Sequence, residues 1–377
     1  MCKSANVYDS DSAPIYLNID ILRFVAPCRA NRDESGRPKT IEINGAERLR
    51  FSSQSIKASI REAFGFVSNV NKDELKKLAE SYDGDEKHNH SYYLPESVVY
   101  EVCGSKEPKE DEKETSSEGK DNVILYVTLE NLHNIMMSKK DIKKKTEKED
   151  KKNAKDSKDG KKGKATKKEC VKDEVAKVSP DIDLFGRMYA SNDAFKVEAC
   201  AQVAHAVSVG KVEIIDDNWV CRSSIEGQAG CVTMGESGIG SALMYFNSNL
   251  NISELKNRKY SKEQIIDIVK RFVMSNYSLE MKSGASGTAH NELPCYCRVT
   301  IKNSSPKNHL GAFYTPVDSD DTIEDVISKL DKCINDEIEE SECINVYKGI
   351  ENKGDSFRFK ANKENLDKLN SILNDLI

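Results

Sequence analysis

The sequence has no apolar run long enough to span a lipid bilayer, so a helical membrane protein is not expected. The stretch from Met1 to Asp11 is polar, which is not typical of a signal peptide, and we expect a cytoplasmic location with no membrane partner. The 11 cysteines have no pairing rhythm, and the one close pair, Cys295 and Cys297, has the wrong spacing for a zinc site. Reduced thiols are therefore expected.

Motifs for catalysis and nucleotide binding are also missing. The sequence contains no P-loop and no recognisable set of nucleophile, histidine and acid. Gly235, Gly238 and Gly240 run in the reverse order of a dinucleotide fingerprint and are interpreted as a hinge. We therefore expect no catalytic residues, no metal and no cofactor.

The composition indicates an ordinary core interrupted by polar insertions. Only 38% of the 377 residues are hydrophobic and 32% are charged, and the net charge is −6. Residues 139–168 contain 15 lysines against 6 acidic residues, which leaves about −15 on the rest of the chain. A tract so poor in apolar residues cannot bury enough surface to order itself. The overall charge therefore says nothing against nucleic-acid binding, which depends on local charge.

Alternating and helical patterns outline the regular elements. They predict a strand over 15–25, a hairpin over 40–51 turning at Asn44-Gly45, a helix from Ser53, a strand over 197–209, a strand over 242–252, a helix opening at the Ser261/Gln264 capping box, and a strand over 295–301. This β-α-β-β-α-β order predicts an α+β fold with a ferredoxin-like or RRM-like sheet. His205 shares the odd positions of the 197–209 strand with apolar residues, so it is expected in the core.

A basic cluster surrounds the predicted start of the helix at Ser53. Arg48 and Arg50 are two apart on a strand and should share one face, while Lys57 and Arg61 are one helical turn apart. Ser52 or Ser53 is suited to cap the helix, and free amides at a helix start attract anions. With hydroxyls, the Gln54 carboxamide and four cations together, the expected anion is a phosphate of a nucleic acid. The alternative is a surface helix that is basic by chance.

Three blocks resemble the backbone subunit of the type I-E CRISPR surveillance complex Cascade, the CasC family of the Cas-seven superfamily of RAMP proteins. The first block joins Asn31-Arg32-Asp33 to the basic cluster. The second contains Gly186-Arg187-Met188 and the segment from Val203 to Val207, and the third is Ala242 to Leu250. The resemblance covers about half of the chain. It implies a hand-like fold with an RRM-like palm, a finger insertion and a β-hairpin thumb.

The resemblance also implies a domain layout. The palm would comprise residues 1–65 and 181–303, the finger insertion 66–180, the thumb 211–236, and the accessory C-terminal helices 304–377. The finger is expected to be partly helical and partly disordered, and its lysine-rich part, 139–168, either contacts target DNA or is a solvated loop. The palm aromatics are not in RNP-motif positions, so bases are not expected to stack on the sheet.

In function, the resemblance implies a non-catalytic subunit that polymerises along a CRISPR guide RNA (crRNA) and supports its pairing with target DNA in antiviral defence. Its partners would be crRNA, target DNA, further copies of itself and other Cascade subunits. The expected RNA-binding residues are Arg32, Lys39, Arg48, Arg50, Ser52, Gln54, Lys57, Arg61, Arg187 and Met188, the last as a wedge between bases. The expected thumb residues are Asn218, Trp219 and Val220, with Trp219 either contacting a base or anchoring the hairpin.

Two other functions stay open. Related backbone subunits of other CRISPR types cleave RNA with a loop aspartate, and Asp33 lies in a comparable loop. Metal-dependent hydrolysis needs several converging carboxylates, which are not recognisable here, so Asp33 is interpreted as a residue that orders Arg32 or caps its loop. The other alternative is a free-standing RNA-binding protein.

Overall fold

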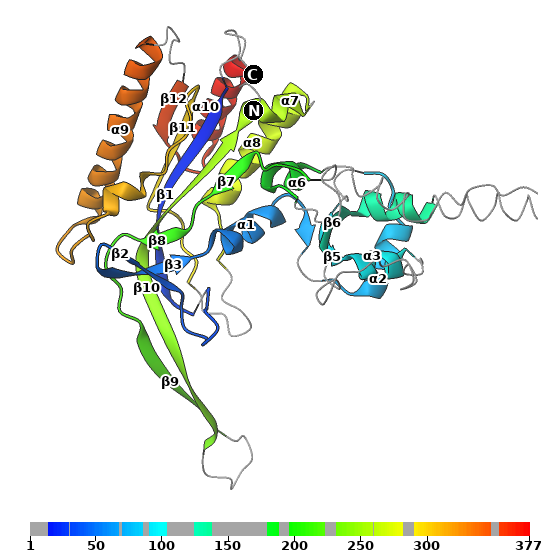
Figure 1. Ribbon diagram of the computed structural model, residues 1–377, viewed down its shortest axis with the longest axis horizontal. Coiled ribbons are helices and arrows are strands. Elements are labelled where there is room, and N and C mark those ends of the chain that lie inside the picture. The colour runs from blue at the N-terminus through cyan, green and yellow to red at the C-terminus, as the bar shows by residue number, and fades with distance from the viewer. Residues whose placement is uncertain are drawn as a thin grey trace, which may run out of the picture. The chain divides into compact units, whose positions relative to one another are not determined.

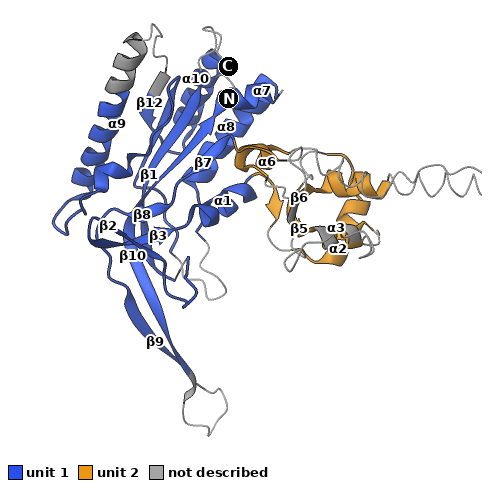
Figure 2. Ribbon diagram, viewed as in Figure 1, with its two compact units in different colours: residues 1–63, 200–377 blue, residues 64–199 orange. Residues whose placement is uncertain are grey.

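The computed structural model is shown in Figure 1. The structure describes residues 14–29, 31–67, 70–85, 90–103, 124–137, 179–187, 196–222, 231–258, 260–281, 290–347 and 354–377. The chain divides into two compact units (Figure 2): unit 1 is residues 1–63 and 200–377, and unit 2 is residues 64–199. Unit 2 therefore interrupts unit 1 in the sequence. The lysine-rich part of the expected finger, residues 139–168, lies outside the described residues.

Unit 1 is built on an antiparallel sheet with the strand order β12-β11-β1-β10-β8-β3-β2. Its strands are β1 (Tyr16–Cys28), β2 (Thr40–Ile43), β3 (Ala46–Phe51), β7 (Ala201–Val203), β8 (Ala206–Ser208), β9 (Ile215–Arg222), β10 (Cys231–Asn251), β11 (Tyr296–Lys302) and β12 (Gly354–Arg358). The order β11-β1-β10-β8 is that of a ferredoxin-like sheet, in which the last strand pairs with the first and the third lies between the first and second. The predicted α+β fold class is confirmed. Strand β12, which pairs with β11, was not anticipated from the sequence.

Helices cover both faces of this sheet. They are α1 (Ser53–Glu62), α7 (Ile252–Asn257), α8 (Lys262–Tyr277), α9 (Ile323–Tyr347) and α10 (Lys363–Leu376), with a 3-10 helix η4 (His309–Phe313). On one face, Leu22 and Tyr245 pack with Leu330 of α9. On the other face of β1, the buried Arg23 guanidinium donates to carbonyls of Asn276 and Tyr277 at the end of α8. Both faces of the sheet are thus covered at Leu22 and Arg23 of β1.

Local signals were reliable in unit 1. The hairpin of β2 and β3 turns at Asn44-Gly45, where both residues have positive φ (51° and 70°), as a two-residue type I′ turn requires. Ser52 caps α1 by accepting a hydrogen bond from the Ser55 amide. Ser261 and Gln264 form the predicted capping box at the start of α8. Each of these three predictions is confirmed. All three features depend on contacts between residues only a few positions apart, which is why the sequence alone could indicate them.

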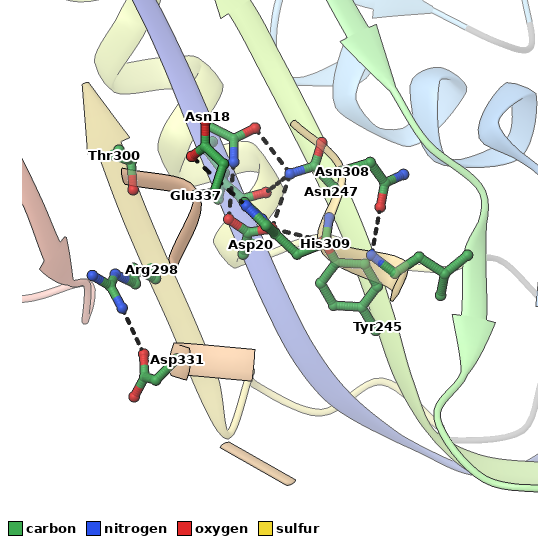
Figure 3. A network of polar contacts seen from close by, with 12 residues as sticks. Asn18, Asp20, Tyr245, Asn247, Arg298, Thr300, Asn308, His309, Asp331 and Glu337 are labelled. Atoms are coloured by element: carbon green, nitrogen blue, oxygen red, sulfur yellow. Dashed lines mark hydrogen bonds and ion pairs between the residues drawn. The ribbon is translucent and has the colours of Figure 1, made fainter. Parts of the chain in front are cut away.

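A buried polar network joins η4 and α9 to the centre of the sheet (Figure 3). The Asp20 carboxylate is fully buried, and its Oδ1 accepts hydrogen bonds from the Tyr245 hydroxyl at 2.7 Å and from Asn247 Nδ2 at 3.0 Å. His309 Nδ1 lies 3.0 Å from the same oxygen, and Asn18 donates to Oδ2. Burial, followed by the neighbouring Asp20 carboxylate, raises the pKa of Tyr245 well above its ordinary value. The network thus fixes η4 against strands β1 and β10.

Unit 2 has its own small hydrophobic core. A three-stranded sheet pairs β5 (Ser91–Pro95) with β4 (Phe66–Val67) and β6 (Ile124–Thr128). The other elements are α2 (Lys72–Glu80), α3 (Glu96–Val102), a helical segment over 129–137 and α6 (Pro180–Phe185). Tyr92, Val127 and Leu132 are buried together in this core. The strands of this sheet were not anticipated, because short pairings between distant segments leave little periodic signal.

Candidate nucleic-acid interface

The start of α1 is tied to the loop that precedes β2. Asn31, which has positive φ (53°), accepts a hydrogen bond from the Ser52 amide at 3.0 Å and donates from Nδ2 to the Ser52 hydroxyl. Two amides of the first helical turn are also used internally: Ser55 N donates to Ser52 Oγ, and Ser53 N donates to His205 Nδ1. The amides of Ser53 and Ser55 are thus not free to bind a phosphate, and the expectation of free amides at this helix start is wrong for these two.

Cationic side chains gather beside this helix start. Arg50 and Lys57 are half-buried, and Arg50 is paired in register with Val207 of β8. Burial, followed by repulsion from Arg61, lowers the pKa of Lys57 below its ordinary value. Partial desolvation of the ring, followed by repulsion from Arg50 and Lys57, likewise lowers the pKa of His205. Because the charges of Arg50 and Lys57 both act on His205, these three residues share one electrostatic environment, which we call the α1 cluster.

Three of the remaining predicted contacts of this region are accessible, and Ser52 is not. Arg32 and Gln54 are exposed and Lys39 is half-buried, whereas Ser52, with 9% of its surface exposed, serves mainly as the cap of α1. Arg32 and Lys39 lie at the ends of the loop that also carries Asn31, and the Lys39 amide donates to the Asn31 carbonyl. Arg32 and Lys39 therefore belong to the same loop as Asn31, which is hydrogen-bonded to Ser52 at the start of α1.

Arg48 is a correction to the predicted site. Only 1% of its surface is exposed, and its guanidinium donates to the carbonyls of Ser208, Val209 and Phe313. Although Arg48 and Arg50 are two apart on β3, the Arg48 end of that face is covered by the segment around η4. Arg48 therefore stabilises the fold, and the prediction of a surface contact with RNA is wrong for this residue in the structure.

Two further predicted cations are also largely covered. Arg61, on the last turn of α1, is 6% exposed, and Arg187 of unit 2 is 3% exposed and forms an isolated bridge with Val197. Gly186, just before it, has positive φ, and a Cβ there would lie 2.9 Å from the Val197 carbonyl oxygen, so the position requires glycine. Met188, the predicted wedge, lies outside the described residues.

His205 is exposed, contrary to the prediction of a core histidine. The register explains the difference: Val203 pairs with Ser248 and Val207 pairs with Tyr245, so the three residues 204–206 oppose the two residues 246 and 247 of β10. This is a β-bulge, and the extra residue breaks the alternation of inward and outward side chains. The expected strand over 197–209 is accordingly observed as two short strands, β7 and β8. The parity of apolar residues could not reveal His205 as a surface residue.

The predicted thumb contains a β-hairpin of β9 and β10. Asn218, Trp219 and Val220 are all exposed. Trp219 is 43% exposed and pairs in register with Gly235, where an added Cβ would lie 2.4 Å from its Cζ2 atom. The indole thus lies against the glycine backbone, which supports its role as an anchor and leaves part of the ring available for contact.

Replacing Gly235 by alanine is expected to displace the Trp219 ring from the hairpin. Because Trp219 is the only tryptophan, its fluorescence reports on this site alone. We expect a red-shifted emission and stronger quenching by acrylamide in Gly235→Ala. Gly311→Ala is the matched control, because a Cβ at Gly311 meets nothing within 4 Å. An unchanged spectrum in Gly235→Ala would contradict this packing.

Asp33 organises its own loop. Its carboxylate accepts hydrogen bonds from the Ser35 amide and hydroxyl and from the Arg37 amide, at 2.9, 2.7 and 3.0 Å. These bonds, with that of the Ser35 hydroxyl as the largest, lower the pKa of Asp33. Arg37 in turn forms an ion pair with Asp216 of β9 at 3.1 Å. Asp33 thus acts as a loop cap, one of the two roles anticipated for it.

The described part of the chain contains no cluster of three or more histidine, cysteine or acidic side chains that could hold a metal. No disulfide is formed by Cys28, Cys103, Cys200, Cys295, Cys297 or Cys333. Among these residues, no helix is both long and apolar enough to cross a membrane.

Comparison with known proteins gives both a family and a fold. A family model described as CT1975-like protein matches residues 17–374. A solved chain described as "CRISPR RNA-guided surveillance complex, pre-nicking" has a TM-score of 0.66 at 18% identity, covering 96% of this chain and 100% of that one. Another, from a "CRISPR RNA-guided surveillance complex", has a TM-score of 0.52 at 17% identity, covering 96% and 98%. At identities this low, the two structural matches establish a similar fold and nothing further. No curated protein matches the chain.

Proposed function

Because the chain belongs to the CT1975-like protein family, we propose that it is a guide-RNA-binding backbone subunit of a CRISPR surveillance complex. The observation that carries the proposal is the α1 cluster, in which Arg50, Lys57 and His205 converge beside a capped helix start. The similarity in fold to chains of two CRISPR RNA-guided surveillance complexes supports the same role. The phosphates of the guide are the ligand that fits this charge.

The α1 cluster suits binding to a backbone and not to particular bases. Cations that neutralise phosphates release counterions, so binding is salt-dependent and nearly independent of sequence. Phosphate contacts position a nucleic acid but carry little sequence information. A subunit that must accept any guide needs this kind of contact. Arg32 and Lys39, on the neighbouring loop, would extend the contact along the strand.

The finer parts of the proposal follow the resemblance to the CasC family. The complex would be a cytoplasmic type I-E Cascade in which copies of the chain polymerise along the crRNA and support its pairing with target DNA. The hairpin of β9 and β10 would be the thumb, with the exposed part of Trp219 available to a base. Unit 2 would contain the finger, and its lysine-rich tract at residues 139–168 would hold target DNA through its charge.

Copurification tests the proposed function. The tagged full-length chain is expressed with a CRISPR array and the other Cascade subunits, and bound nucleic acid is extracted and sized. We expect a uniform short RNA that contains spacer sequence, together with sibling subunits. Recovery of the chain with random cellular RNA would favour a free-standing RNA-binding protein, and recovery without RNA would contradict the proposal.

We also propose that the chain does not cleave RNA or DNA itself, because Asp33 is engaged as a loop cap. The purified chain is incubated with guide-matched RNA and single-stranded DNA in Mg²⁺ or Mn²⁺, and both are expected to stay intact. Cleavage that is lost in Asp33→Ala would establish the nuclease alternative. Cleavage that persists in Asp33→Ala would indicate a contaminant or another site.

A further inference from the structure

The β-bulge between β7 and β8 presents His205 to the surface of the α1 cluster. The bulge adds one residue opposite residues 246 and 247 of β10, and the Ala204 amide is held by the Asn247 carbonyl. Bulges are common next to active sites, where the extra, unpaired residue changes the direction of a side chain. Val203 and Ala206, on either side, remain buried. The bulge thus exposes the histidine between two core positions.

The hydrogen bond from Ser53 sets the tautomer of His205. A backbone amide can only donate, so Nδ1, which lies 2.8 Å from the Ser53 nitrogen, must present a lone pair. The imidazole proton is then on Nε2. The side chain is exposed, and among the residues that the structure describes none accepts a hydrogen bond from Nε2. An exposed, oriented N–H donor is therefore available at the start of α1.

The surroundings of the ring favour its neutral form. Partial desolvation of the ring, followed by repulsion from Arg50 of β3 and Lys57 of α1, lowers the pKa of His205 and so disfavours a second proton. Protonation of Nδ1 would also remove the acceptor of the Ser53 amide. The α1 cluster thus combines two cations, which attract phosphates, with one uncharged donor of fixed direction.

We infer that His205 is a guide-RNA-binding residue that donates from Nε2–H to an oxygen of the RNA backbone, as a neutral side chain held by Ser53 and the bulge. The inference rests on the proposed function and adds a residue to its site. The acceptor is a phosphate oxygen or a ribose 2′-hydroxyl. The role differs from that of Arg50 and Lys57, because a neutral donor fixes the position of the backbone without releasing counterions.

The test measures binding of the full-length chain to an unstructured oligouridine RNA by fluorescence anisotropy at several NaCl concentrations. In His205→Asn, the side-chain oxygen can still accept from the Ser53 amide, but the donor at the Nε2 position is lost. We expect His205→Asn and His205→Ala both to lose roughly tenfold in affinity, as for a hydrogen bond to a charged group. The slope of log affinity against log salt should not change in His205→Asn, whereas Lys57→Ala should flatten it by about one unit.

Gln202→Ala, at an exposed position of β7, is the matched control and should bind like the wild type. The same experiment with an oligodeoxyuridine DNA identifies the acceptor. If His205→Asn loses affinity for both the RNA and the DNA oligonucleotide, the acceptor is a phosphate oxygen. If it loses affinity for the RNA alone, the acceptor is the 2′-hydroxyl.

Wild-type affinity in His205→Asn combined with a loss in His205→Ala would overturn the inference, because His205 would then only hold the Ser53 amide. A flatter salt slope in His205→Asn would also overturn it, since the histidine would be acting as a cation. If the wild-type chain itself does not bind the RNA, the proposed function fails, which is distinguishable from a failure of His205 alone.

Discussion

Replacement of both Arg50 and Lys57 by alanine is expected to weaken guide-RNA binding equally for unrelated sequences. It should also flatten the salt dependence by about two units of slope, one for each lost phosphate contact. Both side chains are accessible beside the capped start of α1, so their loss removes charge from the surface and leaves the core intact. Affinity is measured by anisotropy with at least two RNAs of different sequence and over a range of NaCl concentrations.

Lys329 and Lys332 provide the control for this double variant. Both are exposed on α9, which packs on the opposite face of the sheet from α8. Their replacement by alanine changes the net charge by the same amount, and it should leave the slope unchanged. A sequence-selective loss in the Arg50/Lys57 variant, or an unchanged slope, would contradict the assignment of these residues to phosphates. Arg48 and Arg61 are unsuitable for this test because both are buried.

Replacement of Asp20 by alanine is expected to lower the free energy of unfolding of unit 1 by about 3–5 kcal/mol, the cost typical of breaking a buried charged network. The carboxylate is the shared acceptor of Tyr245, Asn247 and His309. Without it the Tyr245 hydroxyl and His309 Nδ1 would lose this acceptor, whereas Asn247 would keep the oxygens of Asn18 and Ile19. Leaving such groups unsatisfied costs more than the hydrogen bonds themselves contribute. Urea unfolding followed by circular dichroism measures the effect from the shift of the midpoint.

Asp367→Ala is the comparison for Asp20→Ala, because Asp367 is an exposed aspartate on α10. Its replacement should change the free energy of unfolding by no more than about 0.5 kcal/mol. A loss below about 1 kcal/mol in Asp20→Ala would mean that the network does not stabilise the attachment of η4 to the sheet.

The elements and their caps could be predicted from the sequence alone. Asn44-Gly45, the Ser52 cap of α1 and the Ser261/Gln264 capping box each depend on contacts within four residues, and the structure has them as expected. The alternating strands and their order predicted the ferredoxin-like sheet, because the number of topologies that satisfy short right-handed connections is small. The position of the basic cluster at the start of α1 was visible for the same local reason.

Which cations of that cluster are accessible was decided only by the tertiary structure. Arg48 is buried because a segment more than 260 residues later, ending at Phe313, covers it and supplies a carbonyl acceptor. His205 is exposed because β10, another distant segment, pairs with two residues where the chain presents three. Local sequence patterns do not indicate which distant segment packs on a given face of a strand, and they do not indicate a one-residue change in strand register. The sequence therefore determined where the capped start of α1 and its basic residues would form, and long-range packing determined that Arg50, Lys57 and His205 are the residues accessible there.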